Sequence, residues 1–424
     1  MSGSKVSGMD ETQTAAARLR PTGRDARRAL RIGMVGAGVM ARVHSIAPSM
    51  ARQLYPALPL VPEPVVVADV NLGLARDIAR RFGYERAERD WRSVVEADDV
   101  DLVCTCLPPV LNRDVAVAAA SAGKHVLCEK PLAATAAEAR EMLDACVSSG
   151  VAHAMGTAYR WAPALRSMRS LIREGRIGEI RHLRAVFHLD YACSEDLPLS
   201  WRFRSALAGG GAVADTGFHL IDCARFLVGE IANVVALTAR FVQRRRVPAI
   251  DAWDITKDGT VAGRGEVGDV DVEDAAAALV HFENGAYGVI ETSRVASGRR
   301  VSMRIEVYGS KGALEWDLER IDEFQVYVPD DPFVDGFRRV LVSQAHPGGK
   351  ELLIAVAEAT GIGWLGPETT MWAEFISALA EGRPAEANFE DGLRACEVVD
   401  AMYESAETGR VVQVRRVGER VESN

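Results

Sequence analysis

A glycine-containing turn directly after a short apolar segment limits the possible folds of this chain more than any other feature. Residues 31–41 read Arg-Ile-Gly-Met-Val-Gly-Ala-Gly-Val-Met-Ala, a strand that runs into Gly36-x-Gly38-x-x-Ala41. Gly36 allows a tight bend, Gly38 lets the backbone approach a pyrophosphate, and Ala41 lets a helix pack closely on the strand. The turn alone is a weak signal, but it predicts the start of a dinucleotide-binding domain.

Strands and helices alternate after this turn. The expected elements are strands at 64–69, 100–107 and 125–128 and helices at 72–82 and 112–122. Such alternation predicts a doubly wound parallel sheet, a Rossmann domain, over residues 31–152. We interpret residues 53–63, which are rich in Pro and Leu, as an insertion before the second strand. Residues 1–30, polar and rich in arginine, are expected to be a disordered extension.

A carboxylate at the end of the second predicted strand is placed to bind a ribose. Asp69 follows the glycines by about 30 residues, where about 20 is usual. No arginine adjoins it, and a carboxylate repels a 2′-phosphate, so the pattern favours NAD over NADP. The structural alternative is that Asp69 caps the helix that begins near Leu72.

Two further strand ends carry candidate site residues, because ligands of such sheets bind at the carboxyl ends of the strands. They are Leu107-Pro108-Pro109 and Glu129-Lys130-Pro131. Lys130 is informative because arginine is the usual cation here: the chain has 50 basic residues, of which six are lysines. Lysine can donate or share a proton, and arginine effectively cannot. The alternative for Lys130 is a surface salt bridge with Glu129.

Residues 209–222, Gly-Gly-Gly-Ala-Val-Ala-Asp-Thr-Gly-Phe-His-Leu-Ile-Asp, hold a candidate acid/base pair. Asp215 and His219 are four apart, so on a helix both lie on one face and the carboxylate can orient the imidazole. Histidine titrates near neutral pH and can accept a proton from a substrate hydroxyl. The alternatives are a helix-capping Asp215 with an ordinary half-buried His219, or a metal site that includes Asp222. Without a further His or Cys cluster, no metal is expected.

The second half of the chain changes from alternating elements to successive strands. We expect them at 183–190, 234–242, 276–282, 286–293, 303–308 and 313–317. Glu283-Asn284-Gly285 and Ser310-Lys311-Gly312 read as hairpin turns, so this sheet is predicted to be large, open and mostly antiparallel. Residues 153–414 are thus predicted to form a C-terminal α+β domain, with a long loop at 250–274, closing helices at 369–381 and 389–408, and a tail at 415–424.

Composition excludes several classes of function. No apolar run approaches the roughly 20 residues of a membrane-spanning helix. A net charge of −9 argues against nucleic acid as a partner. The seven cysteines form no disulfide pattern, which fits a reducing, cytoplasmic setting. A small molecule is the expected partner.

The order and spacing of three motifs carry a family resemblance. They are Gly36-Ala-Gly38, Glu129-Lys130-Pro131 and Asp215-x-Gly217-x-His219-x-x-Asp222. Together they resemble the Gfo/Idh/MocA oxidoreductase family over about residues 31–414. The segments 199–203 and 361–363 are similar to the levoglucosan dehydrogenase branch of that family. This similarity implies a sugar or a sugar-like cyclic polyol as the substrate.

The resemblance also implies roles for individual residues. Lys130, Asp215 and His219 would meet at the substrate hydroxyl beside a nicotinamide. The implied substrate-binding residues are Lys130, Tyr159, Arg160, Asp215 and His219. The implied cofactor-binding residues are Gly36, Gly38, Val39, Met40, Asp69, Leu107, Pro108, Glu129, Lys130 and Arg202. NAD is the implied cofactor.

One segment departs from the family pattern. The family commonly has Thr-Pro-Asn-x-x-His after the strand that ends near residue 107, whereas this chain has Leu107-Pro108-Pro109-Val-Leu-Asn112. Leu107, Pro109 and Asn112 therefore replace the usual Thr, Asn and His. This puts the usual contacts near the nicotinamide in doubt.

Three functions are compatible with these residues. The first is an NAD-dependent dehydrogenase, in which His219, poised by Asp215, takes the proton of a ring hydroxyl and Lys130 stabilises the oxyanion. Which of Lys130 and His219 is the formal base stays open. The second is a glycoside-cleaving enzyme that oxidises its substrate transiently and keeps NAD bound. The third is a non-enzymatic NAD sensor. The family resemblance also implies that the open face of the second sheet is an oligomer interface, in a homodimer or homotetramer.

Overall fold

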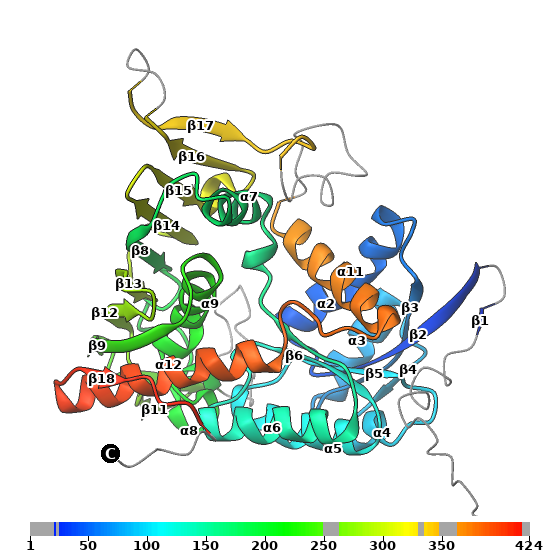
Figure 1. The fold of residues 1–424 in the computed structure, drawn as a ribbon. Helices are drawn as coiled ribbons and strands as arrows, with labels where there is room; N and C mark the ends of the chain where they lie inside the picture. The colour runs from blue at the N-terminus through cyan, green and yellow to red at the C-terminus, as the bar shows by residue number, and fades with distance from the viewer. Residues whose placement is uncertain (1–20, 23–24, 249–262, 330–334, 347–362, 418–424) are drawn as a thin grey trace, which may run out of the picture.

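Two large sheets form the two lobes of the molecule (Figure 1). The computed structural model describes residues 21–22, 25–248, 263–329, 335–346 and 363–417. One lobe contains a mainly parallel seven-stranded sheet, the other a nine-stranded sheet, and β10 and β11 form a separate two-stranded sheet. The predicted fold class, a Rossmann domain followed by an α+β domain, is confirmed.

The first sheet has the strand order β4-β3-β2-β5-β6-β7, all parallel, with β1 antiparallel to β2. The strands are β1 (Pro21–Thr22), β2 (Asp25–Val35), β3 (Leu60–Ala68), β4 (Arg86–Glu88), β5 (Leu102–Thr105), β6 (His125–Glu129) and β7 (His153–Gly156). Successive side chains point to opposite faces, so Met34 and Val35 enter two different hydrophobic cores. Both faces are therefore covered, as in a doubly wound fold.

Helices pack on each face of this sheet. They are α2 (Val39–Leu54), α3 (Leu72–Phe82) and α11 (Leu365–Glu381) on one face, and α4 (Arg92–Val95), α5 (Pro109–Ser121) and α6 (Ala136–Ser149) on the other. Helix α3 has the predicted bounds because both ends are capped. Asn71 accepts hydrogen bonds from Gly73 N and Leu74 N, and Gly83 ends the helix with φ +79°.

Two expectations about the start of this domain are corrected. Strand β2 begins at Asp25, so residues 25–30 belong to the sheet and not to a disordered extension. Residues 1–20, 23 and 24 lie outside the described residues. Residues 53–63 are no separate insertion, because α2 continues to Leu54 and β3 begins at Leu60. The prolines of β3 precede Val66, where pairing with β4 starts, and proline is tolerated where a strand edge is unpaired.

The boundary between the domains also differs from the prediction. Strand β7 pairs with β6, so the parallel sheet extends to Gly156 and not only to residue 152. Helix α11, assigned from the sequence to the second domain, packs against α2. Its Trp372 and Phe375 are buried in a core of the first domain. The chain therefore returns to the first domain after it has formed the second sheet.

The second sheet has the order β17-β16-β15-β14-β8-β13-β12-β9-β18. Its strands are β8 (Ile180–His188), β9 (Ile231–Ala239), β12 (Ala275–Phe282), β13 (Tyr287–Ser293), β14 (Ser302–Gly309), β15 (Ala313–Asp317), β16 (Glu323–Tyr327), β17 (Arg338–Leu341) and β18 (Val412–Gln413). Both predicted hairpins are confirmed, since β12 pairs antiparallel with β13 and β14 with β15. Among the described strands of this sheet, only β8 and β13 are parallel neighbours.

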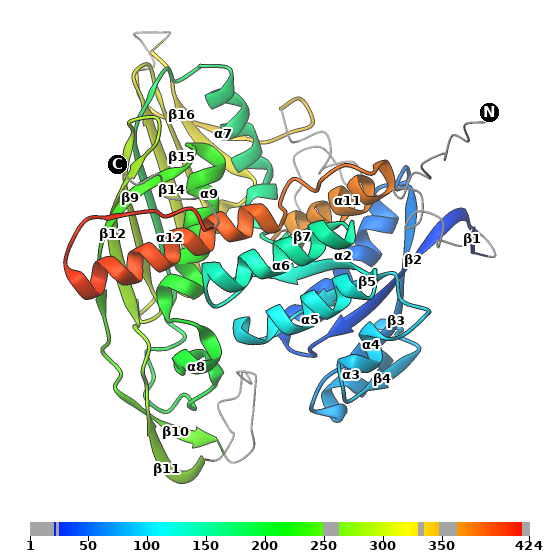
Figure 2. The same ribbon diagram turned by 60° about the horizontal axis from the view of Figure 1, so that its bottom comes forward.

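Helices cover one face of this sheet (Figure 2). They are α7 (Pro163–Arg173), α9 (Phe218–Leu227) and α12 (Phe389–Thr408), of which α12 also packs against α6 of the first domain. The opposite face exposes three large apolar side chains, Leu237, Leu279 and Tyr287, by 72%, 55% and 48%. The helices within the described ranges all lack the length or the apolar character needed to cross a bilayer.

The expected long loop at 250–274 is partly ordered structure. Residues 263–269 form β11, which pairs with β10 (Arg244–Pro248). Val270 and Val272 are buried in a small core with Phe203. The loop prediction is therefore wrong for residues 263–269, whereas residues 270–274 do form a loop between β11 and β12. Residues 249–262 lie outside the described residues.

Candidate active site

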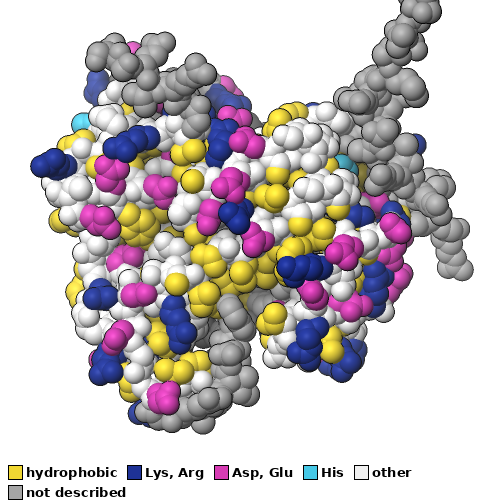
Figure 3. All heavy atoms as spheres, turned by 90° about the horizontal axis from the view of Figure 1, so that it is seen from below, with side chains coloured by type: hydrophobic (Ala, Val, Ile, Leu, Met, Phe, Trp, Pro, Cys, Tyr) yellow, Lys and Arg dark blue, Asp and Glu magenta, His cyan; other side chains and the backbone are white. Residues whose placement is uncertain are grey.

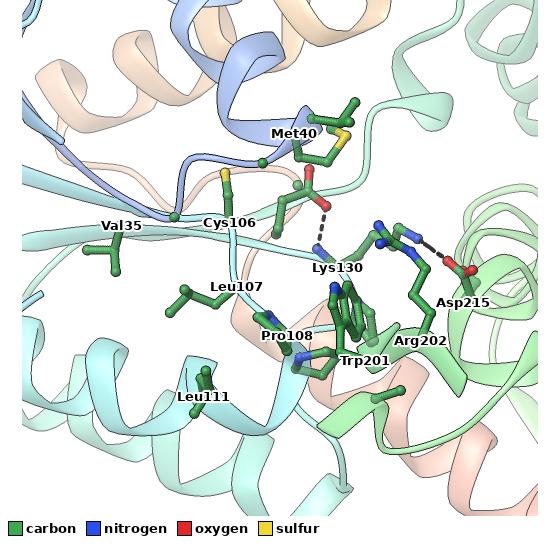
Figure 4. A pocket seen from close by; sticks show the side chains of 18 of the residues that line it. Val35, Met40, Cys106, Leu107, Pro108, Leu111, Lys130, Trp201, Arg202 and Asp215 are labelled. Atoms are coloured by element: carbon green, nitrogen blue, oxygen red, sulfur yellow. Dashed lines mark hydrogen bonds and ion pairs between the residues drawn. The ribbon is translucent and has the colours of Figure 1, made fainter. Parts of the chain in front are cut away.

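A pocket of about 360 Å³ lies between the two domains. It extends from the glycine turn, past the ends of β5 and β6, to the segment 201–219 of the second domain. Figure 4 shows Met40 and Leu107 on the first-domain side, Arg202 and Asp215 on the opposite side, and Lys130 between them. In the space-filling view of Figure 3, hydrophobic side chains gather where the two lobes meet, and charges of both signs are interspersed around them.

Most of the residues proposed from the sequence line this pocket. They are Gly36, Gly38, Val39, Met40, Asp69, Leu107, Pro108, Glu129, Lys130, Tyr159, Arg202, Asp215 and His219. Arg160 is the exception and is described below. The structure thus brings the candidate cofactor-binding and catalytic residues into one space.

The glycine turn has the geometry that a bound pyrophosphate requires. Gly36 has φ +101°, and a Cβ there would lie 2.4 Å from the carbonyl oxygen of Cys106. Gly38 precedes α2, and no side chain caps that end of the helix. Its backbone N–H groups and the positive end of its dipole are thus available to an anion. The turn therefore fits a dinucleotide.

Asp69 holds the turn and does not cap α3. Its Oδ2 accepts a hydrogen bond of 2.8 Å from Ala37 N, and its Oδ1 accepts one of 2.7 Å from Asn71 N. The capping residue of α3 is Asn71, so the structural alternative for Asp69 is excluded. The carboxylate lines the pocket beside the glycine turn, the position expected for a ribose-binding group.

Lys130 reaches across the domain boundary. Its Nζ lies 3.2 Å from Asp215 Oδ1 and 3.1 Å from the Asp215 carbonyl oxygen (Figure 4). Glu129 makes other contacts: its Oε2 accepts a hydrogen bond from Lys130 N at 2.9 Å, and its Oε1 lies 2.8 Å from His44 Nε2. The alternative of a surface salt bridge between Lys130 and Glu129 is therefore not what the structure shows.

The expected contact between Asp215 and His219 is absent from the hydrogen bonds of the described residues. Residues 213–217 form a π-helical turn before α9. A π-helix has more residues per turn than an α-helix, so side chains four residues apart no longer lie on the same face. Asp215 instead accepts from Lys130 and from Tyr191 Oη at 3.2 Å. The His219 ring packs edge-on against Tyr159, with ring centroids 4.8 Å apart. Aromatic packing, and not the carboxylate, orients this imidazole.

The electrostatics of the site favour two distinct protonation states. Burial alone would raise the pKa of Asp215, but Lys130, Arg202 and Arg294 together hold it well below its usual range. Burial and the charge of Lys130 lower the pKa of His219 well below its usual value. At neutral pH the site therefore combines an ionised Asp215 with a neutral imidazole that can accept a proton.

Arg160 does not line the pocket. Its guanidinium is buried, donates to Asp222, and also contacts Asp391 at 3.2 Å and the carbonyl oxygen of Glu386. The expectation that Arg160 binds substrate is corrected, because these contacts join η1 (Tyr159–Trp161), α9 and α12. Asp222 is paired with Arg160, so its carboxylate is not available to the metal site that the sequence left open as an alternative.

The segment 107–112, whose sequence departs from the family pattern, contacts the loop after Lys130 and lines the pocket. Asn112 is buried on α5, and its Nδ2 donates to the carbonyl oxygens of Pro131 and Leu132, each at 3.3 Å. It therefore supports the loop that follows Lys130. Leu107 and Pro108 line the pocket, which makes this wall apolar.

Several pocket residues were missed by sequence reasoning. Trp364 and Glu368 belong to the start of α11, and the helix was expected to begin only at Thr369. Arg294 directly follows β13 and donates to the carbonyl oxygens of Arg202 and Glu273. The position of a residue directly after a predicted strand indicates a ligand site only in a parallel sheet, because ligands bind at the carboxyl ends of such strands. No sequence signal placed α11 at the pocket.

A buried series of hydrogen bonds, from Trp372 through His44, fixes the side chain of Glu129. Trp372 Nε1 donates to His44 Nδ1 at 2.9 Å. Because an indole N–H can only donate, His44 Nδ1 is the acceptor, and Nε2 carries the proton toward Glu129. Potential ligand atoms of His44, Cys104 and Cys106 lie within 4.8 Å of one another, but both ring nitrogens of His44 already have protein partners.

The fold and the pocket define an oxidoreductase with an NAD-binding Rossmann domain and a second domain that completes the site. The chain belongs to the Gfo/Idh/MocA oxidoreductase family. The family model described as an oxidoreductase family with an NAD-binding Rossmann fold matches residues 30–157. The model of the GFO/IDH/MocA C-terminal domain matches residues 165–315. NAD is the cofactor of this domain.

Known relatives are similar over nearly the whole chain. Levoglucosan dehydrogenase of Pseudarthrobacter phenanthrenivorans is 37% identical over 390 residues, 92% of this chain and 99% of that protein. Myo-inositol 2-dehydrogenase of Thermotoga maritima is 26% identical over 393 residues, with 92% and 99% covered. A solved structure of levoglucosan dehydrogenase in complex with NADH and levoglucosan has a TM-score of 0.85 at 35% identity, with 92% and 100% covered. The family includes dehydrogenases of sugars and polyols.

Proposed function

We propose that this protein oxidises a ring hydroxyl of a sugar, an anhydrosugar or a cyclic polyol to a ketone, or catalyses the reverse reaction. The contact of 3.2 Å between Lys130 Nζ and Asp215 Oδ1 carries the proposal, because it joins the two domains in the pocket that His219 also lines. The names of the relatives, levoglucosan dehydrogenase and myo-inositol 2-dehydrogenase, support this substrate class.

Different side chains accept the hydroxyl proton and stabilise the developing negative charge. Bound NAD would supply the hydride acceptor for the carbon that carries the hydroxyl. His219 accepts the hydroxyl proton, since its ring is neutral and has no hydrogen-bond partner among the described residues. Lys130 Nζ stabilises the negative charge that develops on the same oxygen. Asp215 holds the Lys130 side chain in place.

The first domain orients the cofactor. Gly36 and Gly38 let the backbone approach the pyrophosphate, and Asp69 binds the adenosine ribose. Val39 and Met40 begin α2 beside the turn and line the same pocket. Glu129, fixed by His44 and by Lys130 N, lines the same pocket and would contact the nicotinamide ribose.

The exposed face of the second sheet is proposed as the surface where copies of this chain pair. Leu237, Leu279 and Tyr287 project from β9, β12 and β13 on the side away from the helices. Exposed apolar clusters of this kind mark interaction sites. A dimer or tetramer in sedimentation supports this assembly, and a monomer at micromolar concentration contradicts it.

A panel of sugars, inositols and anhydrosugars, assayed for NADH absorbance, tests the function. We expect NADH to form from NAD with at least one anhydrosugar or polyol, and NADPH to form far more slowly from NADP. Glycosides incubated without added NAD form the second arm of the assay. Release of free sugar there, with no net NADH in the first arm, would contradict the dehydrogenase and indicate cleavage through transient oxidation.

A further inference from the structure

Glu368 is a buried acid that lines the pocket and has no hydrogen-bond partner among the described residues. It lies on the first turn of α11, lines the pocket, and is 2% exposed. Its Oε2 is fully buried and has no hydrogen-bond partner, and its Oε1 makes no hydrogen bond to any described residue. A buried carboxyl that lacks partners costs stability, so a native protein rarely keeps one without a reason.

The neighbouring carboxylates differ from Glu368 in this respect. Glu129 accepts from Lys130 N and contacts His44, and Asp215 accepts from Lys130 and Tyr191. These two acids are engaged by the protein itself. Like Glu368, His219 has no hydrogen-bond partner among the described residues. We have proposed that His219 contacts the substrate. Both groups are thus available to a molecule in the pocket.

The surroundings of Glu368 favour its neutral form. Burial raises its pKa to about 8, and the nearby charge of Glu129 acts in the same direction, against the opposing charge of Lys130. A neutral carboxylic acid offers one O–H donor and an acceptor oxygen. The titratable groups that interact with it, from four elements, are His44 on α2, Cys104 on β5, Glu129 and Lys130 at the end of β6, and Tyr159 on η1.

We propose that Glu368 is a ligand-binding residue that exchanges hydrogen bonds with a hydroxyl of the sugar or with the carboxamide of the nicotinamide. This inference rests on the proposed function, because both ligands come from it. A hydroxyl and a carboxamide each offer a donor and an acceptor, which matches the neutral acid. Ionisation of Glu368 would remove its donor and place a second negative charge near Glu129.

Two substitutions separate hydrogen bonding from mere bulk. Glu368→Gln keeps the shape, a donor and an acceptor but cannot ionise, whereas Glu368→Ala removes all three. Glu381→Ala takes a carboxylate from the exposed end of the same helix and is the matched control. For each protein the KM for the sugar, kcat and the Kd for NADH are measured from pH 6.5 to 9.5, together with the thermal midpoint.

We expect Glu368→Ala to weaken binding about tenfold at pH 7, as for a lost hydrogen bond to a buried group. Glu368→Gln should stay within about threefold of the wild type at that pH. A rise in the KM for the sugar identifies the hydroxyl as the partner, and a rise in the Kd for NADH identifies the carboxamide. In the wild type that binding should weaken above about pH 8, as Glu368 ionises. Glu368→Gln should lose this alkaline weakening.

Unchanged KM and Kd in Glu368→Ala would overturn the inference. If that variant fails to fold, an alkaline weakening that persists in Glu368→Gln overturns it instead. A wild type that forms no NADH with any sugar refutes the proposed function separately. The Kd for NADH would then still test whether Glu368 contacts the cofactor.

Discussion

The cofactor end and the substrate end of the pocket are built in different ways. At the cofactor end, Gly36, Gly38 and Asp69 come from one strand-helix-strand unit; the glycines act through backbone geometry and Asp69 through its carboxylate. At the substrate end, side chains from distant segments are held by ion pairs, as with Lys130 and Asp215. The comparison teaches that a local motif can specify the cofactor, whereas the substrate depends on the tertiary arrangement. Substitutions at one end should therefore leave the other end intact.

Lys130→Met should have the largest effect. It removes the ammonium that stabilises the developing oxyanion, so kcat/KM should fall about a thousandfold, equivalent to ~4 kcal/mol of transition-state stabilisation. The Kd for NADH, measured by fluorescence titration, should change less than threefold. Lys311→Met, in the exposed turn between β14 and β15, is the control. Unchanged turnover in Lys130→Met would end the proposed mechanism.

Gly36→Ala should have an intermediate effect at the opposite end. The positive φ and the contact of 2.4 Å with the Cys106 carbonyl oxygen should lower the free energy of unfolding by about 2 kcal/mol. The Kd for NADH should rise about tenfold, because the turn must shift. Gly83→Ala has a similar φ, +79°, but open space around its Cβ, so it should cost about 1 kcal/mol without changing the Kd. Equal Kd values for Gly36→Ala and wild type would refute the assigned role.

Asp69→Ala should have the smallest effect of the three. Loss of the carboxylate that we propose to bind the ribose should weaken NADH binding about fivefold, ~1 kcal/mol. NADPH binding should improve, since the repulsion of the 2′-phosphate is removed. Asp77→Ala on α3 removes a charge from a nearby surface ion pair and controls for net charge. A constant ratio of the two affinities in Asp69→Ala would show that Asp69 does not select the cofactor.

Much of the first domain could be predicted because its signals are local. Caps fix both ends of α3, and the glycine turn follows directly from the strand before it. The predictions failed where a residue's partner lies far away in the sequence. The family resemblance implied that Arg160 binds substrate, yet its charge is buried against Asp222 of α9.

Most residues of the site were predicted from the sequence, but their contacts with one another were not. Spacing alone placed Asp215 and His219 on one helical face, and it did not foresee the π-helical turn that separates them. The role of Asp215 therefore changes from orienting His219 to holding Lys130. Glu368 was missed because only the packing of α11 on α2 brings it to the pocket.

The return of α11 to the first domain has a consequence for shortened forms of the protein. Trp372 supplies the N–H that fixes His44, and His44 in turn fixes Glu129 at the floor of the cofactor cleft. A stop codon at residue 363 would leave every glycine-turn residue in place. It would still remove one wall of the nucleotide cleft and open the apolar side of α2 to water. The nucleotide-binding half of this polypeptide is thus finished only when its last helices have been synthesised.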